Sequence, residues 1–215
     1  MTPIFETSDI VFVLQNCFYS ITRVFFGVAV ALFIGISLGL IRSALPEAFK
    51  KSILLKFLFE APKFPPPIAW IPFVILTFGI GEISAYTIVF IGAFSPIFTN
   101  SYDGAESVPN VIRNTSKSLE IRGLRYLFQI VFFSALPQIF TGIRVGISMG
   151  WMSVIAAEMI SGQSGLGYSI QLNRLNLDYT MMVVDMLLIG IIGWLLNEFV
   201  KLLERRILAW DEKNI

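Results

Sequence analysis

The side chains with the most chemistry to offer lie in a polar segment, Ser101 to Arg125, between two stretches too apolar for a water-soluble protein. A charged element held out between two such apolar stretches is suited to binding a soluble protein. We therefore expect this segment to contact a soluble partner. Its charged residues include Arg113, Lys117, Glu120, Arg122 and Arg125.

Catalytic and metal chemistry have little support in the sequence. It contains no histidine, which removes the commonest general base and the commonest metal ligand. Cys17 is the only cysteine, so neither an intrachain disulfide nor a zinc-ligand spacing is available. The sequence also lacks the glycine-rich loop and lysine that cradle nucleotide phosphates. We expect no cofactor in this chain, and any ATP and magnesium to be bound by another subunit.

Composition indicates an all-α polytopic membrane protein with a single domain over residues 1–215. Hydrophobic residues make up 55% of the sequence and the mean hydropathy is +0.75. Only 14% of residues are charged, against roughly 25% in a typical soluble domain.

Uncharged stretches near 20 residues long, the length that crosses a hydrocarbon core of about 30 Å, predict five membrane spans. We place the start of the fourth at Pro137 and interpret Tyr126 to Ala135 as its approach along the membrane interface. Gly27, Gly35 and Gly39 form a small-residue stripe that would admit a close neighbour to the first span. The predicted spans are residues 17–41, 64–81, 83–100, 136–160 and 179–198.

Loop charges predict the orientation, because cytoplasmic loops retain lysine and arginine. Thirteen such residues fall on one side of the five spans and only Arg174 falls on the other. The N-terminus is thus expected outside the cell and the C-terminus in the cytoplasm. The thirteen are Arg42, Lys50, Lys51, Lys56, Lys63, Arg113, Lys117, Arg122, Arg125, Lys201, Arg205, Arg206 and Lys213.

The polar segment has the signals of a short helix. Ser107 suits the cap, Pro109 the first turn, and Gly123 a break about 14 residues later. Val111 and Leu119 would share one face with Thr115. Such a helix could lie on lipid headgroups, or it could be a rigid docking element for a soluble protein, and the residues alone do not decide between the two.

The run from Asn114 to Glu158 resembles the cytoplasmic loop and following span of binding-protein-dependent ABC importer permeases. The subgroup that it most resembles moves nitrate, bicarbonate, taurine and aliphatic sulfonates. The resemblance covers nearly the whole chain from about Asn16 onward. It includes the motifs Pro67-Ile-Ala-Trp-Ile-Pro72, Phe78-Gly79-Ile80, Ser161-Gly-Gln-Ser-Gly-Leu-Gly167 and Leu202-Leu-Glu-Arg-Arg206.

The family signature is degenerate in this chain. Its glutamate falls on Asn114, its second alanine on Ser116 and its glycine on Glu120, whereas Gly123 matches a second glycine common in the subgroup. Small polar residues at 114 and 116 still allow a close helix fit. By this resemblance the ATPase-coupling residues are Arg113, Asn114, Ser116, Lys117, Leu119, Glu120, Arg122 and Gly123.

The resemblance implies a permease subunit of a type I ABC importer, in a prokaryotic plasma membrane. Two copies would form the pathway for a small, anionic solute, with a cytoplasmic ATPase and an extracytoplasmic binding protein as partners and lipid around them. ATP hydrolysis is expected in the ATPase and no catalysis in this chain. Such permeases commonly have six spans, and the first is expected to be missing or to lie upstream of Met1.

Charged residues inside spans cost about 2.5–3.5 kcal/mol each and call for an explanation. Arg144 could attract an anion in the pore, or extend to the headgroups. Glu158 could belong to an outer gate or cap the span, and Asp185 could pair across helices. Trp151 could line the pore with Met149, or simply pack.

Two other classes of protein stay open. A secondary transporter or channel subunit would work without an ATPase, but the sequence shows no evident internal repeat. A membrane-embedded enzyme would need a polar catalytic cluster, which the three isolated charges do not supply. Selectivity in the family rests largely on the binding protein, so the substrate is not fixed by this chain.

Overall fold

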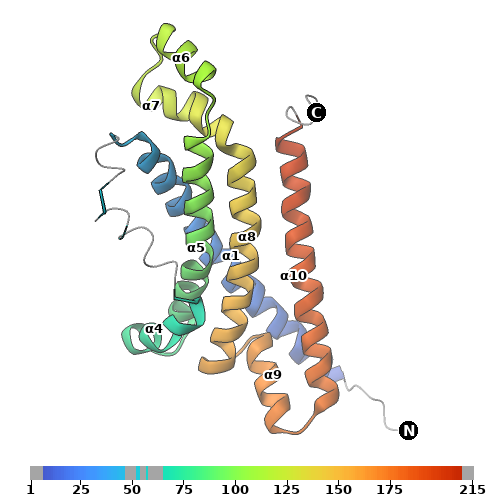
Figure 1. The fold of residues 1–215 in the computed structure, drawn as a ribbon. Helices are drawn as coiled ribbons and strands as arrows, with labels where there is room; N and C mark the ends of the chain where they lie inside the picture. Colours follow the sequence, from blue (N-terminus) through green and yellow to red (C-terminus); the bar gives the residue numbers. More distant parts are fainter. Residues whose placement is uncertain (1–6, 47–51, 54–56, 58–64, 210–215) are drawn as a thin grey trace. The chain divides into compact units, whose positions relative to one another are not determined.

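The computed structural model describes residues 7–46, 52–53, 57 and 65–209 of the protein (Figure 1). Every regular element in these residues is a helix. Phe64, the predicted start of the second span, and Lys50, Lys51, Lys56, Lys63 and Lys213 of the orientation argument lie outside the described residues. The elements are α1 (Thr7–Ala44), η2 (Pro67–Trp70), α4 (Ile71–Phe78), α5 (Glu82–Glu106), α6 (Asn110–Ser118), α7 (Gly123–Tyr126), the π-helix η3 (Leu127–Val131), α8 (Phe132–Ser161), α9 (Leu166–Leu175) and α10 (Tyr179–Ile207).

Four helices among the described residues are long and apolar enough to cross a membrane, judged by length and composition. They contain four of the five predicted spans. A self-contained helix is what an apolar sequence must form in lipid, because each backbone amide needs a partner within its own segment. The four are Ile10–Ala44, Glu82–Glu106, Gly123–Ser161 and Tyr179–Ile207.

The predicted span at residues 64–81 is shorter in the structure. Its helical part, Pro67–Trp70 followed by Ile71–Phe78, extends about 20 Å at helical rises, less than a hydrocarbon core. Pro66 precedes it in an extended conformation, and Gly79 ends it with a φ of 77°. Hydropathy counted the flanking apolar residues as helix, whereas proline and a left-handed glycine limit the helix at both ends.

The fourth span also differs from the prediction, because residues 126–135 do not form a separate interfacial approach. One helical run extends from Gly123 to Ser161 and passes through a π-helix at Leu127–Val131. Pro137 lies inside α8 rather than at its start. The uncharged sequence before this proline continues the helix, and a proline is tolerated inside a long apolar helix of this kind.

The chain divides into two compact units. The first comprises residues 1–29, 66–92 and 147–197, and its apolar core joins Ile71 and Val74 of α4 to Ile88 and Ala157. The second comprises residues 30–65, 93–146 and 198–215, with Leu40, Ala105, Val108 and Val131 at its core.

The glycine stripe of the first span meets α5 at close range, as predicted. In the first unit a Cβ at Gly27 would lie 2.6 Å from Val89 Cβ. In the second unit a Cβ at Gly39 would lie 2.8 Å from Ser101 Cβ. Only glycine lets the two backbones approach this closely.

Candidate functional site

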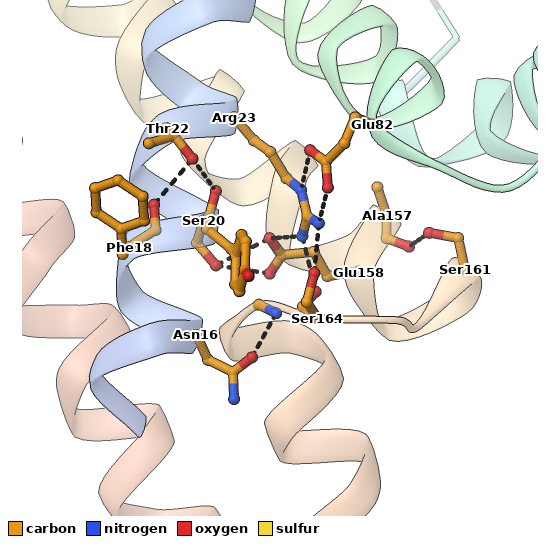
Figure 2. Close-up of polar contacts among 12 residues, drawn as sticks. Asn16, Phe18, Ser20, Thr22, Arg23, Glu82, Ala157, Glu158, Ser161 and Ser164 are labelled. Carbon is orange, nitrogen blue, oxygen red and sulfur yellow. Dashed lines mark hydrogen bonds and ion pairs between the residues drawn. The ribbon is translucent and has the colours of Figure 1, made fainter. Parts of the chain in front are cut away.

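The first unit holds what we call the buried polar cluster, made of Asn16, Ser20, Arg23, Glu82, Glu158 and Ser164 (Figure 2). Asn16, Ser20, Arg23 and Glu158 are its buried members. Its centre is Arg23, whose side chain is 6% exposed. The guanidinium donates from Nη1 to Glu158 Oε1 at 2.8 Å and from Nε to Glu82 Oε2 at 2.9 Å, and a second ion pair joins Nη2 to Glu82. It also donates to the Ser164 carbonyl at 2.7 Å and to its hydroxyl at 2.6 Å. One cation therefore ties α1 to α5, α8 and the loop before α9.

The two carboxylates that meet Arg23 lie in different environments. The Glu158 side chain is 1% exposed, whereas that of Glu82 is 49% exposed. A buried carboxylate without its cation would be strongly unfavourable, and a half-exposed one would be hydrated. Arg23 is thus the necessary counter-ion of Glu158 and an optional one of Glu82.

The same cluster fixes the start of α9. Glu158 Oε2 accepts a hydrogen bond from the Gly167 amide at 3.0 Å, and Ser20 Oγ accepts one from the Leu166 amide at 2.9 Å. Asn16 Oδ1 accepts from the Gly165 amide at 2.7 Å. Side chains of α1 and α8 therefore cap the amides that begin α9, which its own sequence leaves uncapped.

Two glycines make this capping sterically feasible. Gly165 has a φ of 103°, and a Cβ there would overlap the Glu158 carboxylate. A Cβ at Gly167 would lie 2.9 Å from Glu158 Cβ. The Gly-Leu-Gly sequence at 165–167, which matches no nucleotide fingerprint, thus has a structural purpose in this chain.

Two further predicted intramembrane sites of the first unit, Asp185 and Trp151, are also buried. Asp185 is 0% exposed and accepts from Ser169 Oγ at 2.7 Å and Asn173 Nδ2 at 2.8 Å, so it joins α10 to α9. Trp151 is 5% exposed and its Nε1 donates to the Ile189 carbonyl at 3.1 Å, which favours the packing role over pore lining. Met149 is 44% exposed.

Arg144 belongs to the second unit and has intramolecular partners there. Its Nε lies 3.5 Å from Glu204 Oε2, and its Nη2 donates to Thr141 Oγ1 at 3.3 Å. The side chain is one-third exposed. A paired arginine is a weaker anion attractor than the sequence alone suggested.

The second unit also carries what we call the basic element, residues 110–123, which contains all eight predicted coupling residues. Its helix α6 ends at Ser118, earlier than predicted, and Pro109 lies just before its first residue. Ser107 does not cap it, because its hydroxyl donates to the Gly104 carbonyl at 2.8 Å. Asn114 is exposed, and Ser116 is 2% exposed with its hydroxyl on the Ile112 carbonyl.

A turn with a left-handed residue ends α6. The Ile121 amide donates to the Ser116 carbonyl and the Glu120 amide to the Lys117 carbonyl, the pattern of a Schellman motif. Glu120 occupies its left-handed position with a φ of 54°. This is the position at which the resemblance expects glycine, so the substituted residue keeps the turn and carries its strain.

Two faces of α6 present different chemistry. Val111 and Leu119 are 76% and 66% exposed, and Thr115 between them is exposed. Arg113 and Lys117 instead line a pocket of about 540 Å³, together with Arg122 and Gly123. The side chains of these three cations form no hydrogen bond or ion pair with any residue that the structure describes.

Sequence reasoning missed Arg23 and Glu82 as site residues. The available signal was the presence of charges of opposite sign, Arg23 and Glu158, in two apolar spans. An unpaired charge inside a span is costly, so the two could have been expected to pair. Which helices would face each other was not readable from one sequence. Among the described residues, no group of three acidic or cysteine side chains could hold a metal ion.

Comparison with known proteins gives the family. Residues 31–209 match the binding-protein-dependent transport system inner membrane component family. The chain is 34% identical to the nitrate import permease protein NrtB of Synechocystis, over 91% of this chain and 70% of that protein. It is 34% identical to the bicarbonate transport system permease protein CmpB of Synechococcus elongatus, over 88% and 67%, and 30% identical to the Escherichia coli taurine transport system permease protein TauC, over 91% and 70%.

The fold is shared with a solved importer. An inward-facing structure of the MetNI methionine ABC transporter superposes with a TM-score of 0.77 at 15% identity, over 95% of this chain and 98% of that one. The family match, the relatives and the four apolar helices agree with one another. The chain belongs to the binding-protein-dependent inner membrane components and is a membrane-spanning permease subunit of an ABC importer.

Proposed function

We propose that α6 is the element through which a cytoplasmic ABC ATPase acts on this permease. The observation that carries the proposal is the exposed apolar stripe made by Val111 in α6 and Leu119 at its C-cap, both more than half exposed. Exposed apolar side chains on a short, rigid helix suit insertion into a groove of a partner protein. ATP and magnesium would be bound and hydrolysed in that partner, with no cofactor in this chain.

The proposed orientation places α6 in the cytoplasm, with the N-terminus outside and the C-terminus inside a prokaryotic plasma membrane. It rests on the bias of basic residues among the loops. In this orientation the buried polar cluster and the loop at 161–167 belong to the extracytoplasmic side. The binding protein would dock there, on a loop whose backbone the cluster holds in one conformation.

Two copies of the chain would form the translocation pathway. The helix α10 supports this, because only 6% of its apolar window is buried within the chain. A second copy and lipid would share that surface. ATP-driven closure of the ATPases would favour one conformation of the pair over the other, since a ligand shifts an equilibrium only by its preference between states.

The proposed substrate is a small anion, or a solute that carries an anionic group. Three relatives over most of the chain are named for nitrate, bicarbonate and taurine.

Arg144 and Glu158, predicted for the pore or a gate, both have intramolecular partners, as do Trp151 and Asp185. We therefore propose that Glu158 acts on the outer side by holding the loop before α9.

The test is retention of the cognate ATPase by tagged permease in detergent. Leu119→Glu, which places a charge in the exposed stripe, should reduce co-elution and stimulated ATP hydrolysis at least tenfold. Leu175→Glu is the matched control, because Leu175 is 69% exposed and lies in α9. Normal ATPase retention by Leu119→Glu would refute the docking face.

Uptake assays separate the importer from its alternative. Cells that express the permease, ATPase and binding protein should accumulate labelled nitrate, bicarbonate or taurine only with an active ATPase. Uptake that continues when the ATPase is inactivated would instead support a secondary transporter or channel subunit.

A further inference from the structure

The pocket beside α6 joins four of the predicted coupling residues, Arg113, Lys117, Arg122 and Gly123, to an apolar floor that the coupling function does not explain. It lies in the second unit, where α1 ends at Ser43 and Ala44, α5 ends at Ala105 and Glu106, and the helical run toward α8 begins. All three are ends of candidate membrane spans. The 25 residues of α5 exceed a hydrocarbon core of about 30 Å by about five residues, so its end at Glu106, and the pocket with it, would lie in the headgroup layer.

Its rim and floor differ in chemistry. Three cations, Arg113, Lys117 and Arg122, stand against one acid, Glu106. Ala105 and Val131 on the floor are 4% and 3% exposed, and Leu127 lies beside them. A free inorganic anion would use the rim and gain nothing from the floor. A ligand with an anionic head and an apolar body would use both.

Helix geometry separates the pocket from the proposed ATPase surface. Residues two apart on an α-helix point about 200° from each other, so Arg113 and Lys117 face away from Val111, Thr115 and Leu119. Neither Val111 nor Leu119 lines the pocket. An ATPase bound on the apolar stripe would leave the basic face turned toward the ends of the spans.

We propose that this pocket binds the headgroup of an anionic phospholipid, with Arg113, Lys117 and Arg122 on its phosphate and the acyl chains continuing along the helical run. Basic pockets at the cytoplasmic ends of membrane helices are a known chemistry for such headgroups. The volume of about 540 Å³ lies within the roughly 300–1,000 Å³ of ligand sites. A lipid bound at this site braces α6 against the ends of α1 and α5.

The experiment measures lipid retention by the delipidated, full-length permease with native mass spectrometry after adding phosphatidylglycerol or phosphatidylcholine. Wild-type protein should retain phosphatidylglycerol preferentially. Each pocket cation removed, in Arg113→Gln or Lys117→Gln, should reduce this preference about fivefold. Arg125→Gln is the matched control, because Arg125 is exposed, pairs with Gln129 at 3.0 Å and does not line the pocket.

Four results would overturn the proposal. Equal retention of the two lipids would show that the pocket does not select anionic headgroups. An equal effect of Arg125→Gln would show that the preference depends on the overall positive charge of the protein and not on the pocket. Displacement by inorganic phosphate at millimolar concentration would make it a free-anion site. If adding the ATPase releases the lipid, the pocket belongs to the protein interface instead.

The lipid site uses the proposed orientation but not the proposed ATPase contact, and a position outside the pocket distinguishes the two. Leu119→Glu should lose co-elution of the ATPase while its preference for phosphatidylglycerol persists, because Leu119 does not line the pocket. Arg113→Lys keeps the charge and should retain the lipid preference. Loss of that preference in Leu119→Glu would contradict the assignment of the two faces.

Discussion

The buried polar cluster and the basic element contain the same kinds of side chain in opposite states. Arg23 is 6% exposed and meets two carboxylates and Ser164. Arg113, Lys117 and Arg122 have no such partner among the residues that the structure describes. Charged side chains that are paired inside the chain hold its backbone in place. Charged side chains that are not paired within the chain are available to bind a lipid or a protein.

This contrast predicts that stability and coupling can be separated by mutation. Changes in the cluster should lower the free energy of unfolding whatever the partner, because the interactions lie within one unit. Changes in the basic element should leave stability nearly unaltered and alter binding. The largest effect on stability is expected at the centre of the cluster.

Arg23→Met should destabilise the permease by about 3–5 kcal/mol, because it leaves Glu158 buried without a cation. Reversible denaturation in mixed micelles measures the free energy of unfolding. The double variant Arg23→Met with Glu158→Met should recover much of the loss, since it removes both charges. Lys117→Met in the basic element should change stability by less than about 0.5 kcal/mol. Equal losses of stability in Arg23→Met and Lys117→Met would contradict the difference between the buried polar cluster and the basic element.

Glu158→Gln and Glu82→Gln compare the two carboxylates on one cation. Glu158 also accepts hydrogen bonds from Ser20 and the Gly167 amide, so its loss should cost about 1–3 kcal/mol. Glu82 is half exposed, so its loss should cost less than about 1 kcal/mol. The same denaturation assay ranks them. A larger effect at Glu82 would make the half-exposed pair the main anchor of Arg23.

Gly167→Ala tests the capping of α9 sterically. The new methyl would lie 2.3 Å from the Ile155 carbonyl oxygen and 2.9 Å from Glu158 Cβ, and overpacking of this kind costs about 1–3 kcal/mol. Gly190→Ala is the matched control, because Gly190 is also helical and nothing lies within 4 Å of its Cβ position. The temperature of thermal unfolding should fall for the first and not for the second. An unchanged transition in both would mean that the loop adjusts freely around Glu158.

Much of this fold is predictable because lipid imposes one rule on the backbone. Every spanning segment must satisfy its own amides, so four of the stretches chosen by hydropathy lie within long apolar helices. The helix predicted over residues 64–81 is shorter in the structure, because hydropathy does not show that the backbone at Gly79 has a positive φ. Local backbone geometry limits that helix, and a hydropathy average over many residues does not detect such geometry.

The polar cluster was beyond reach for a different reason. Arg23 and Glu158 are 135 positions apart, and a single sequence does not say which face of one span meets which face of another. The predicted coupling residues came instead from the resemblance, which carried them over position by position. That same resemblance expected a glycine where this chain has Glu120, and the structure gives the physical meaning of the mismatch.

Glu120→Gly should stabilise the end of α6, by less than about 1 kcal/mol. A left-handed conformation costs a side-chain residue about 1–2 kcal/mol, and part of the gain is offset by the freedom of glycine when unfolded. Hydrogen exchange of the α6 amides should slow by up to about fivefold, whereas Glu120→Ala, which keeps a Cβ, should not slow it. Leu177, with a φ of 58° at the same position of the turn after α9, should respond alike to glycine. If only Glu120→Ala slowed hydrogen exchange of the α6 amides, the charge of the Glu120 side chain, and not backbone strain, would govern the stability of this turn. The basic element would then differ from the buried polar cluster in electrostatics alone.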